Sequence, residues 1–284
     1  MKIKKTCILV AVFFLFLIVL SGLFTFFQQK LSFGGKVALV RIEGPIIEAK
    51  SIIDEIDGYI KDNSIKALVL RVNSPGGGVV PSQEIYDEVK RLAAQKKVVV
   101  SMGSLAASGG YYISAPANKI VANPGTITGS IGVIMEVPNV KALMDKIGVK
   151  TEVIKSGKHK DLASPFRGIG KEEREILQGV MDDVHAQFIA AVSEGRKMPI
   201  NKVREIADGR IFSGRQAIEA GLVDELGDLD YAIKAAAKMA GIKGEPEVIT
   251  KKEKNRFLDL LSGRMQESIS KILPSPELKY MYAP

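Results

Sequence analysis

Short runs of apolar residues alternate along this chain with segments of helical periodicity. The apolar runs are residues 37–42, 67–72, 98–100, 120–122 and 152–154. Such near-continuous runs are typical of strands that are buried on both faces of a parallel sheet. Residues 82–95, and a segment that begins at Lys171 and includes Ile176, Val180 and Val184, instead repeat their apolar residues at helical spacing. The alternation predicts an α/β fold with parallel strand pairing.

The N-terminus carries a different signal, an apolar segment without any charge at residues 7–27. About 20 such residues span a bilayer as a helix. The segment is longer than the apolar part of a cleaved secretory signal and has no small-residue cleavage site, which favours an uncleaved anchor. Lys2, Lys4 and Lys5 precede it. This cluster predicts a single-pass protein of the cell membrane, with a cytoplasmic N-terminus and the bulk of the chain outside the cytoplasm.

The formal net charge of +8 does not indicate a nucleic-acid-binding protein, because the excess of basic residues flanks the folded part. Residues 1–34 contain four lysines and no acidic residue, and residues 250–284 contain seven basic and four acidic residues. This distribution fits membrane orientation better than a basic DNA-binding face. We therefore expect no nucleic-acid partner.

Cysteine and histidine are nearly absent, which limits the chemistry that the chain can perform. Cys7 is the only cysteine, and it lies in the apolar segment. The rest of the chain therefore has no disulfide and no thiol chemistry. His159 and His185 are the only histidines, so a zinc site would need carboxylates for nearly all its ligands. We expect no metal and no other cofactor.

These features divide the chain into three parts. Residues 1–34 are expected to hold the cytoplasmic end, the membrane anchor and a hinge, and residues 35–245 the α/β domain. Residues 246–284 are expected to add a last strand near residues 246–250, an amphipathic helix at residues 257–272 and a flexible end from residue 278.

Two glycine-rich segments follow predicted strands, at residues 73–78 and 108–110. Neither matches a phosphate-binding loop. They could be two tight turns in which glycine adopts positive φ. The alternative is an active site: Ala106, Ser108 and Gly110 resemble the small-x-Ser-x-Gly turn that exposes a nucleophilic serine. Glycine amides beside such a serine can form an oxyanion hole. Ser104 and Ser114 are weaker candidates, because no glycine directly follows either one.

A serine nucleophile also needs a base. His185 lies in a helical pattern, which favours a packed or solvated role. His159 lies among Lys155, Lys158 and Lys160. A lysine base must be neutral, and burial and nearby positive charge must lower the usual pKa of about 10.4 by roughly three units. The spacing alone does not choose among these groups.

Several motifs in order along the chain resemble the signal peptide peptidase A family of bacteria and archaea. They lie at residues 73–78, 106–114, 126–133, 156–161, 164–165 and 207–210. The length matches the short, single-domain form of that family. The resemblance implies a crotonase-like fold, related to the proteolytic subunit of Clp protease, behind the N-terminal transmembrane helix.

The resemblance also implies site residues and an activity. Ser108 would be the nucleophile and Lys160 the general base, with no metal or cofactor. The amides of Gly77 and Gly109 would form the oxyanion hole, and Ser130 would orient the lysine. The chain would be a membrane-anchored serine endopeptidase that degrades cleaved signal peptides and other unfolded peptides. The family forms ring-like homo-oligomers whose active sites face a shared interior.

Three alternatives remain open at this point. One is a related Ser/Lys membrane protease that clips a partner membrane protein. Another is a crotonase-like acyl-CoA enzyme, which would have a similar oxyanion hole but no serine nucleophile. The third is a scaffold without catalytic activity. Residues 278–284 themselves look like a peptide substrate, and we expect them to occupy an active site in the assembly and to be trimmed there.

Overall fold

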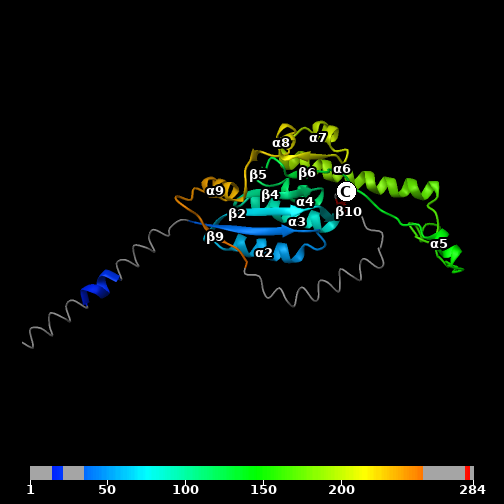
Figure 1. Ribbon diagram of the computed structural model, residues 1–284, viewed down its shortest axis with the longest axis horizontal. Coiled ribbons are helices and arrows are strands. Elements are labelled where there is room, and N and C mark those ends of the chain that lie inside the picture. Colours follow the sequence, from blue (N-terminus) through cyan, green and yellow to red (C-terminus); the bar gives the residue numbers. More distant parts are fainter. Residues whose placement is uncertain (1–14, 22–34, 252–278, 282–284) are drawn as a thin grey trace, which may run out of the picture.

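A computed structural model describes residues 15–21, 35–251 and 279–281 (Figure 1). Within these residues no helix is long and apolar enough to cross a membrane. Residues 15–21 are helical and exposed. The rest of the predicted anchor at residues 7–27 lies outside the described residues, as does the predicted helix at residues 257–272.

The centre of the molecule is a mostly parallel sheet in the order β7-β6-β4-β2-β1-β9, and β5 and β8 extend it beside β4. Only β6 and β7 pair antiparallel within it. The strands of this sheet are β1 (Lys36–Glu43), β2 (Ile65–Ser74), β4 (Lys97–Ala107), β5 (Lys119–Ala122), β6 (Ile127–Gly129), β7 (Ile211–Ser213), β8 (Glu225–Leu226) and β9 (Glu247–Ile249). The prediction of a parallel α/β fold is confirmed.

Helices cover both faces of this sheet. The helices described between residues 35 and 251, of which α5 lies away from the sheet, are α2 (Lys50–Lys61), α3 (Val79–Ala93), α4 (Gly109–Ser114), α5 (Lys141–Lys146), α6 (Lys171–Arg196), α7 (Ile200–Ile206), α8 (Gly214–Glu219) and α9 (Leu229–Met239). In β1, Val37 and Leu39 pack with α9, whereas Ala38 and Val40 join a larger core with α2, α3, α4 and α6. Since neighbouring residues of a strand point to opposite faces, a strand buried on both must be apolar throughout.

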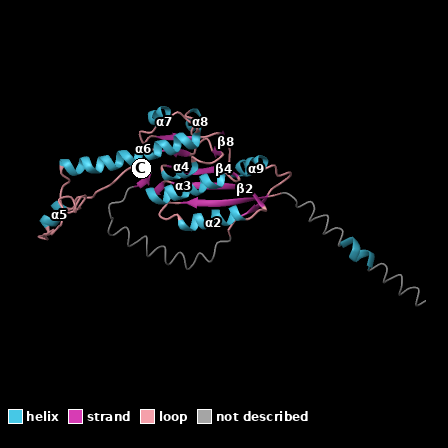
Figure 2. Ribbon diagram, turned by 180° about the vertical axis from the view of Figure 1, so that it is seen from behind, coloured by secondary structure: helices cyan, strands magenta, loops and turns pink. Residues whose placement is uncertain are grey.

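One part of the molecule projects away from the sheet. Figures 1 and 2 show α6 running from the body to the outer end of an arm that also carries α5. We call residues 141–180 the arm. Residues 152–154, which the apolar pattern predicts to be a strand, form no strand here. That prediction is wrong because no described strand lies beside the segment, and the Ile154 side chain is fully exposed.

The C-terminal part returns to the body. The predicted strand near residues 246–250 is confirmed as β9, which pairs in parallel with β1. Residues 279–281, predicted to be flexible, instead form β10 (Lys279–Met281), which pairs antiparallel with β3 (Gly76–Gly78). The segment is ordered because its backbone completes a two-stranded sheet and Tyr280 is fully buried.

Candidate active site

Ser108 lies at the junction of β4 and α4, at the carboxyl edge of the parallel sheet. It is 1 % exposed and has a φ of 53°, which is unusual for a residue other than glycine. Its amide donates to the Gly129 carbonyl at 2.8 Å, and its carbonyl accepts from the Tyr112 amide at 2.8 Å. This strained strand-to-helix turn is the geometry that presents a nucleophilic serine.

The glycine strand β3 runs beside the start of α4, next to Ser108. Ile46 donates to the Gly76 carbonyl and accepts from the Gly78 amide, both at 2.8 Å. Because hydrogen-bonding groups alternate along a strand, the Gly77 amide faces the opposite edge. A Cβ at Gly76, where φ is +96°, would lie 2.6 Å from the Gly109 amide nitrogen. The two amides predicted to form an oxyanion hole therefore belong to adjoining backbone segments.

Ser130 follows β6, and the strand register brings it beside Ser108. Gly129 pairs with Ala107, so the next residue of each strand leaves the sheet at the same edge. Ser130 is largely buried, has a φ of 50°, and donates its amide to the Arg210 carbonyl at 2.8 Å. The backbone is thus held in an uncommon conformation at both serines.

A hollow of about 410 Å³ opens beside Ser130. His185 of α6, Asp182, Asp208 and Met281 of the C-terminal strand are among the residues that line it. The Nε2 atom of His185 is buried and has no hydrogen-bond partner among the residues that the structure describes. The helical pattern around this histidine favoured a packed or solvated role, but the fold brings it to the same hollow as Ser130.

The C-terminal strand β10 lies along the glycine strand. Tyr280 pairs with Gly77, and on its other side Lys279 exchanges two hydrogen bonds of 3.2 Å with Ile134. A Cβ at Gly76 would lie 2.0 Å from the Tyr280 carbonyl oxygen, and a Cβ at Gly109 would lie 3.1 Å from it. The tail therefore occupies the edge that an extended peptide substrate would need, with one carbonyl over the predicted oxyanion hole.

Lys160 lies in the loop between α5 and α6, which ion pairs hold together. Arg167 contacts Asp161 at 2.8 Å and Glu173 at 2.5 Å, and Lys155 contacts Asp161 at 2.5 Å. Hydrogen bonds from Arg167 and Lys155 hold the pKa of Asp161 well below its usual range, and those from Arg167 and the Gly170 amide lower the pKa of Glu173 to about 2. Both carboxylates are therefore charged at neutral pH.

The three lysines of this loop differ in their ion pairs. Lys155 pairs with Asp161, and Lys158 pairs with Glu172, which also lies 3.3 Å from His159. Lys160 is exposed and, among the residues that the structure describes, makes no ion pair. It is therefore the lysine of the loop whose ammonium group is available for another role.

The fold does not bring Lys160 to Ser108 within one chain. The loop between α5 and α6 lies at the outer end of the arm in both views, whereas α4 lies in the body (Figures 1 and 2). Ser108, Gly77, Gly109 and Ser130 are together at one edge of the sheet. Only the lysine of the predicted site stands apart from them.

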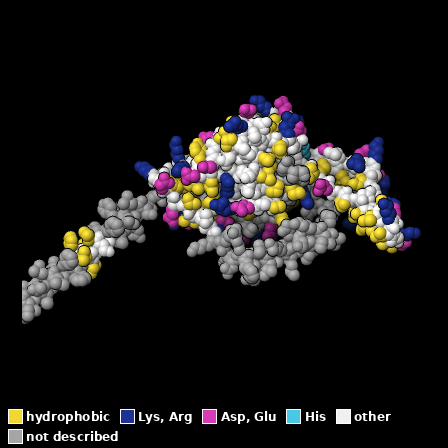
Figure 3. Space-filling model, in the orientation of Figure 1, with side chains coloured by type: hydrophobic (Ala, Val, Ile, Leu, Met, Phe, Trp, Pro, Cys, Tyr) yellow, Lys and Arg dark blue, Asp and Glu magenta, His cyan; other side chains and the backbone are white. Residues whose placement is uncertain are grey.

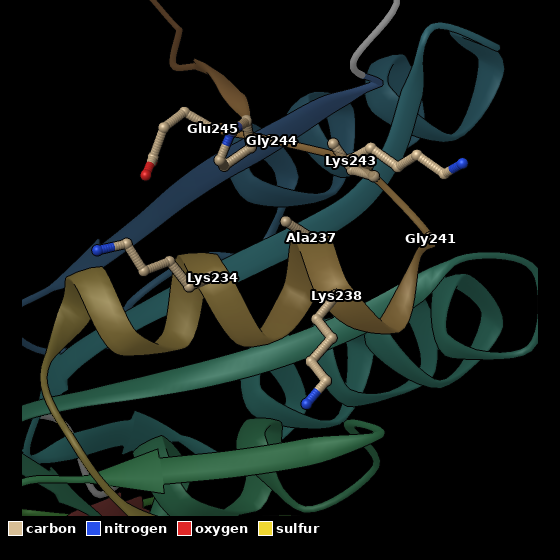
Figure 4. A pocket seen from close by; sticks show the side chains of 9 residues that line it. Lys234, Ala237, Lys238, Gly241, Lys243, Gly244 and Glu245 are labelled. Carbon is tan, nitrogen blue, oxygen red and sulfur yellow. The ribbon is translucent and has the colours of Figure 1, made fainter.

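A second hollow of about 410 Å³ lies at the end of α9, away from this site. Figure 4 shows Lys234, Lys238 and Lys243 around it pointing in different directions, so their charges do not converge on one ligand. Within the described residues there is also no group of three or more side chains suited to hold a metal ion.

Sequence reasoning missed the side chains that surround Tyr280. Tyr112 follows Ser108 in α4, but Phe188 and Val184 come from α6 and Tyr280 from the end of the chain. A signal was present in the peptide-like sequence of residues 278–284. It did not indicate which residue of the tail enters the site.

Comparison with known proteins gives two matching family models. Peptidase family S49 matches residues 90–243, and Clp protease matches residues 42–126. A provisionally named protease of Methanocaldococcus jannaschii is 39% identical over 268 residues, which are 87% of this chain and 86% of that protein. A provisionally named signal peptide peptidase of Enterococcus faecium is 42% identical over 190 residues, 66% of this chain and 55% of that protein. The chloroplastic serine protease SPPA of Arabidopsis thaliana is 36% identical over 216 residues, 74% of this chain and 32% of that protein.

Proposed function

The chain belongs to peptidase family S49, in which it is a serine endopeptidase of the signal peptide peptidase A type, and from this premise we propose that Ser108 is its nucleophile and Lys160 of a second copy its general base. The observation that carries this proposal is the strained turn at Ser108 beside the Gly77 and Gly109 amides. The expected substrates are peptides in extended conformation.

Ser108, Gly109 and the glycine strand β3, which together we call the glycine edge, suit acyl transfer. The Ser108 oxygen would attack a peptide carbonyl carbon while its proton passes to the neutral lysine amine. The carbonyl oxygen becomes negatively charged, and the Gly77 and Gly109 amides would stabilise it. The lysine then protonates the leaving amine, and water later releases the acyl group from Ser108 by the reverse proton path. The Tyr280 carbonyl lies close to Gly76 and Gly109, and Tyr280 pairs with Gly77, so this carbonyl would mimic the substrate carbonyl.

A second copy is the source of the base because the arm separates Lys160 from Ser108. Figure 3 shows hydrophobic side chains gathered on the arm. The exposed ones include Leu143, Ile147, Val153, Ile154, Phe166, Ile176 and Val180. An exposed apolar surface of this extent marks an interaction site. In a ring, each arm would be covered by a neighbour and would deliver its lysine to the neighbour's serine.

Ser130 would receive that lysine. It is next to Ser108 at the sheet edge and lines the hollow beside the tail. A lysine that enters this hollow would find the Ser130 hydroxyl as a hydrogen-bond partner, which would aim its amine at Ser108. Asp182 and Asp208 line the same hollow and would attract a cationic side chain.

We infer that the enzyme acts at the cell membrane on signal peptides that remain after secretion. The uncharged segment at residues 7–27 supports an anchor with the catalytic domain outside the cytoplasm. An anchor would keep the site close to substrates that are themselves apolar. The similarity to a relative named for signal peptide cleavage supports the same substrate class.

The test is peptide cleavage by the full-length chain in detergent across pH 6 to 10. We expect Ser108→Ala and Lys160→Ala each to reduce kcat by at least about 1000-fold. His159→Ala and His185→Ala should retain activity. Since deprotonation creates the lysine base, wild-type activity should rise with pH in this range.

Mixing the two inactive variants then tests the second copy. Ser108→Ala supplies an intact Lys160, and Lys160→Ala supplies an intact Ser108, so mixed rings should recover part of the activity. No recovery, after subunit exchange is verified with differently tagged chains, would place both groups in one chain. Loss of activity in His185→Ala with retention in Lys160→Ala would make the histidine of the hollow the base.

A further inference from the structure

Lysines gather at the edge where the central strands of the sheet begin. The strands β1, β2, β4 and β5 run in parallel, so they start at the same edge, which we call the amino edge. The first or second residue of each is a lysine: Lys36, Lys66, Lys97 and Lys119. The end of α9 lies here too, because a Cβ at Gly35, just before β1, would meet Lys66 and would lie 3.3 Å from Ile242.

Four exposed lysines of this edge make no ion pair within the part of the chain that the structure describes. We call them the basic edge: Lys66, Lys97, Lys238 and Lys243. Two acidic residues nearby are already paired, Glu247 with Lys36 at 3.4 Å and Glu225 with Lys119 at 2.6 Å. Asp62 and Glu245 remain, so positive charge is in excess at this edge.

The basic edge is broad, and its charges do not meet at one point. Figure 4 shows Lys238 and Lys243 pointing in different directions from the hollow that they line. Together they do not fit a single phosphate or carboxylate, which would need converging donors. A surface of many anions has no such requirement, since each lysine can meet an anion of its own. Anionic lipid headgroups form such a surface.

The point where the chain enters the domain favours a lipid surface as the partner. The uncharged segment ends at Phe27, and residues 28–34 separate it from Gly35. An extended chain spans at most about 3.6 Å per residue, so an anchor in this segment would keep the amino edge within about 30 Å of the bilayer. Figures 1 and 2 show α9 at the end of the body opposite the arm. Docking there would leave the arm free for a neighbour.

We propose that the basic edge docks the catalytic domain on the membrane by binding anionic lipid headgroups. The inference rests on the proposed function, because the anchor at residues 7–27 would bring this edge to the bilayer. It also deepens that function, since Ser108, at the carboxyl edge, would then face away from the membrane. The ten residues of β2 span about 33 Å. A peptide must therefore leave the bilayer surface before Ser108 can cleave it.

Energy transfer to a labelled lipid tests the docking. The full-length chain would carry Cys7→Ser, to remove its only thiol, and Asn63→Cys, to attach a fluorophore at an exposed turn before β2. Vesicles would contain an acceptor lipid in phosphatidylcholine alone or in an equimolar mixture with phosphatidylglycerol. We expect stronger transfer in the mixed vesicles. The difference should disappear in about 1 M salt, where the Debye length is about 3 Å.

Removal of two charges identifies the residues responsible. Lys238→Gln combined with Lys243→Gln should shift the balance between docked and undocked domains about 25-fold toward the undocked state, about 5-fold for each lysine. Lys202→Gln combined with Arg204→Gln removes two exposed charges of α7 and is the matched control, which should dock as the wild type does.

Equal transfer in both kinds of vesicle would overturn the inference, as would an unchanged salt-sensitive difference in the Lys238 and Lys243 double variant. Smaller particles of that variant in light scattering would overturn it as well, and would assign the edge to a second copy.

Two further measurements separate this inference from the proposed function. Both double variants should cleave peptides in detergent as the wild type does. If Ser108→Ala still cleaves while its transfer depends on anionic lipid, the proposed nucleophile alone is wrong. A chain that does not float with phosphatidylcholine vesicles lacks the proposed anchor, but it should still float with the mixed vesicles through the basic edge.

Discussion

At the scale of single residues, the site depends on close approach of backbone segments. Ser108 has a positive φ, and Gly109 beside it has almost no free space around its α-carbon. A Cβ at Gly109 would lie 2.7 Å from the Ser82 hydroxyl and 3.1 Å from the Gly76 α-carbon. The distance between the two predicted oxyanion donors therefore depends on the absence of that one methyl group.

Gly109→Ala tests this dependence. We expect kcat to fall about 100- to 1000-fold, because the added methyl must displace one of the amides that hold the oxyanion. The overpacking should cost about 1–3 kcal/mol of stability, so Tm is measured alongside kcat. Gly125→Ala is the matched control, since a Cβ at Gly125 meets nothing within 4 Å. An active Gly109→Ala enzyme would exclude this amide from the oxyanion hole.

The sequence could predict those site residues that lie next to one another in short motifs. Ser108, Gly109 and the residues of the glycine strand are adjacent in short motifs, so their chemistry is visible without a fold. The rings that contact Tyr280 come from α4 and α6, whereas Tyr280 itself comes from the end of the chain. No periodicity links these segments, and only the folded backbone brings them together.

At the scale of elements, the loop that carries Lys160 is fastened to α6 by charge. Arg167 bridges Asp161, next to Lys160, and Glu173, in the first turn of α6. The Glu173 carboxylate also accepts the Gly170 amide at 3.0 Å, which caps the helix. These contacts would hold the lysine in one place relative to the arm.

Arg167→Gln should remove this fastening in a pH-dependent way. The lowered pKa values of Asp161 and Glu173 mean that their stabilisation is present above their unfolded pKa values, near 4. It is lost as the pH falls toward about 2 for Glu173 and toward a still lower pH for Asp161. The Tm difference between wild type and Arg167→Gln should therefore be largest above about pH 5 and should shrink between pH 5 and 3. Arg174→Gln, on the same helix, should show no such trend. A difference that is constant with pH would contradict the assignment.

The position of β10 predicts where the tail is trimmed. If the Tyr280 carbonyl occupies the oxyanion hole, the bond to Met281 is the one exposed to Ser108. Mass spectrometry of the purified full-length chain should find a terminus at Tyr280, and Ser108→Ala should keep Pro284. A complete terminus in an active wild-type enzyme would show that the tail occupies the site without being cleaved.

The strands of the sheet could be predicted from the sequence, because a strand that is buried on both faces consists of a continuous run of apolar residues. The same rule failed at residues 152–154, where the apolar residues face outward from the arm. A run of apolar residues predicts that these side chains become buried. It does not predict whether the rest of the sheet or another protein chain buries them. The tail strand was missed for the converse reason, since its partner, the glycine strand, is about 200 residues earlier in the sequence.

At the scale of the whole molecule, one helix connects the two halves of the proposed mechanism. The C-terminal half of α6 contacts Tyr280 through the Phe188 ring and the Val184 carbonyl. Its N-terminal half lies on the arm and begins beside the Lys160 loop. Assembly of the arms would therefore set the position of both the lysine base and the part of α6 that contacts the C-terminal strand.

Ile154→Asp tests whether the arm is a subunit interface. The Ile154 side chain is fully exposed in the single chain, so the substitution should leave the Tm of a dissociated subunit nearly unchanged. Buried against a neighbour, however, an unpaired carboxylate is costly, and the ring should dissociate. Light scattering after size exclusion in detergent should then show smaller particles, and kcat should fall at least about 10-fold because Ser108 loses its base.

Ile200→Asp, an exposed apolar position on α7, is the matched control and should keep both assembly and activity. An assembled and active Ile154→Asp enzyme would mean that Lys160 reaches Ser108 by another route, such as folding of the arm onto its own body.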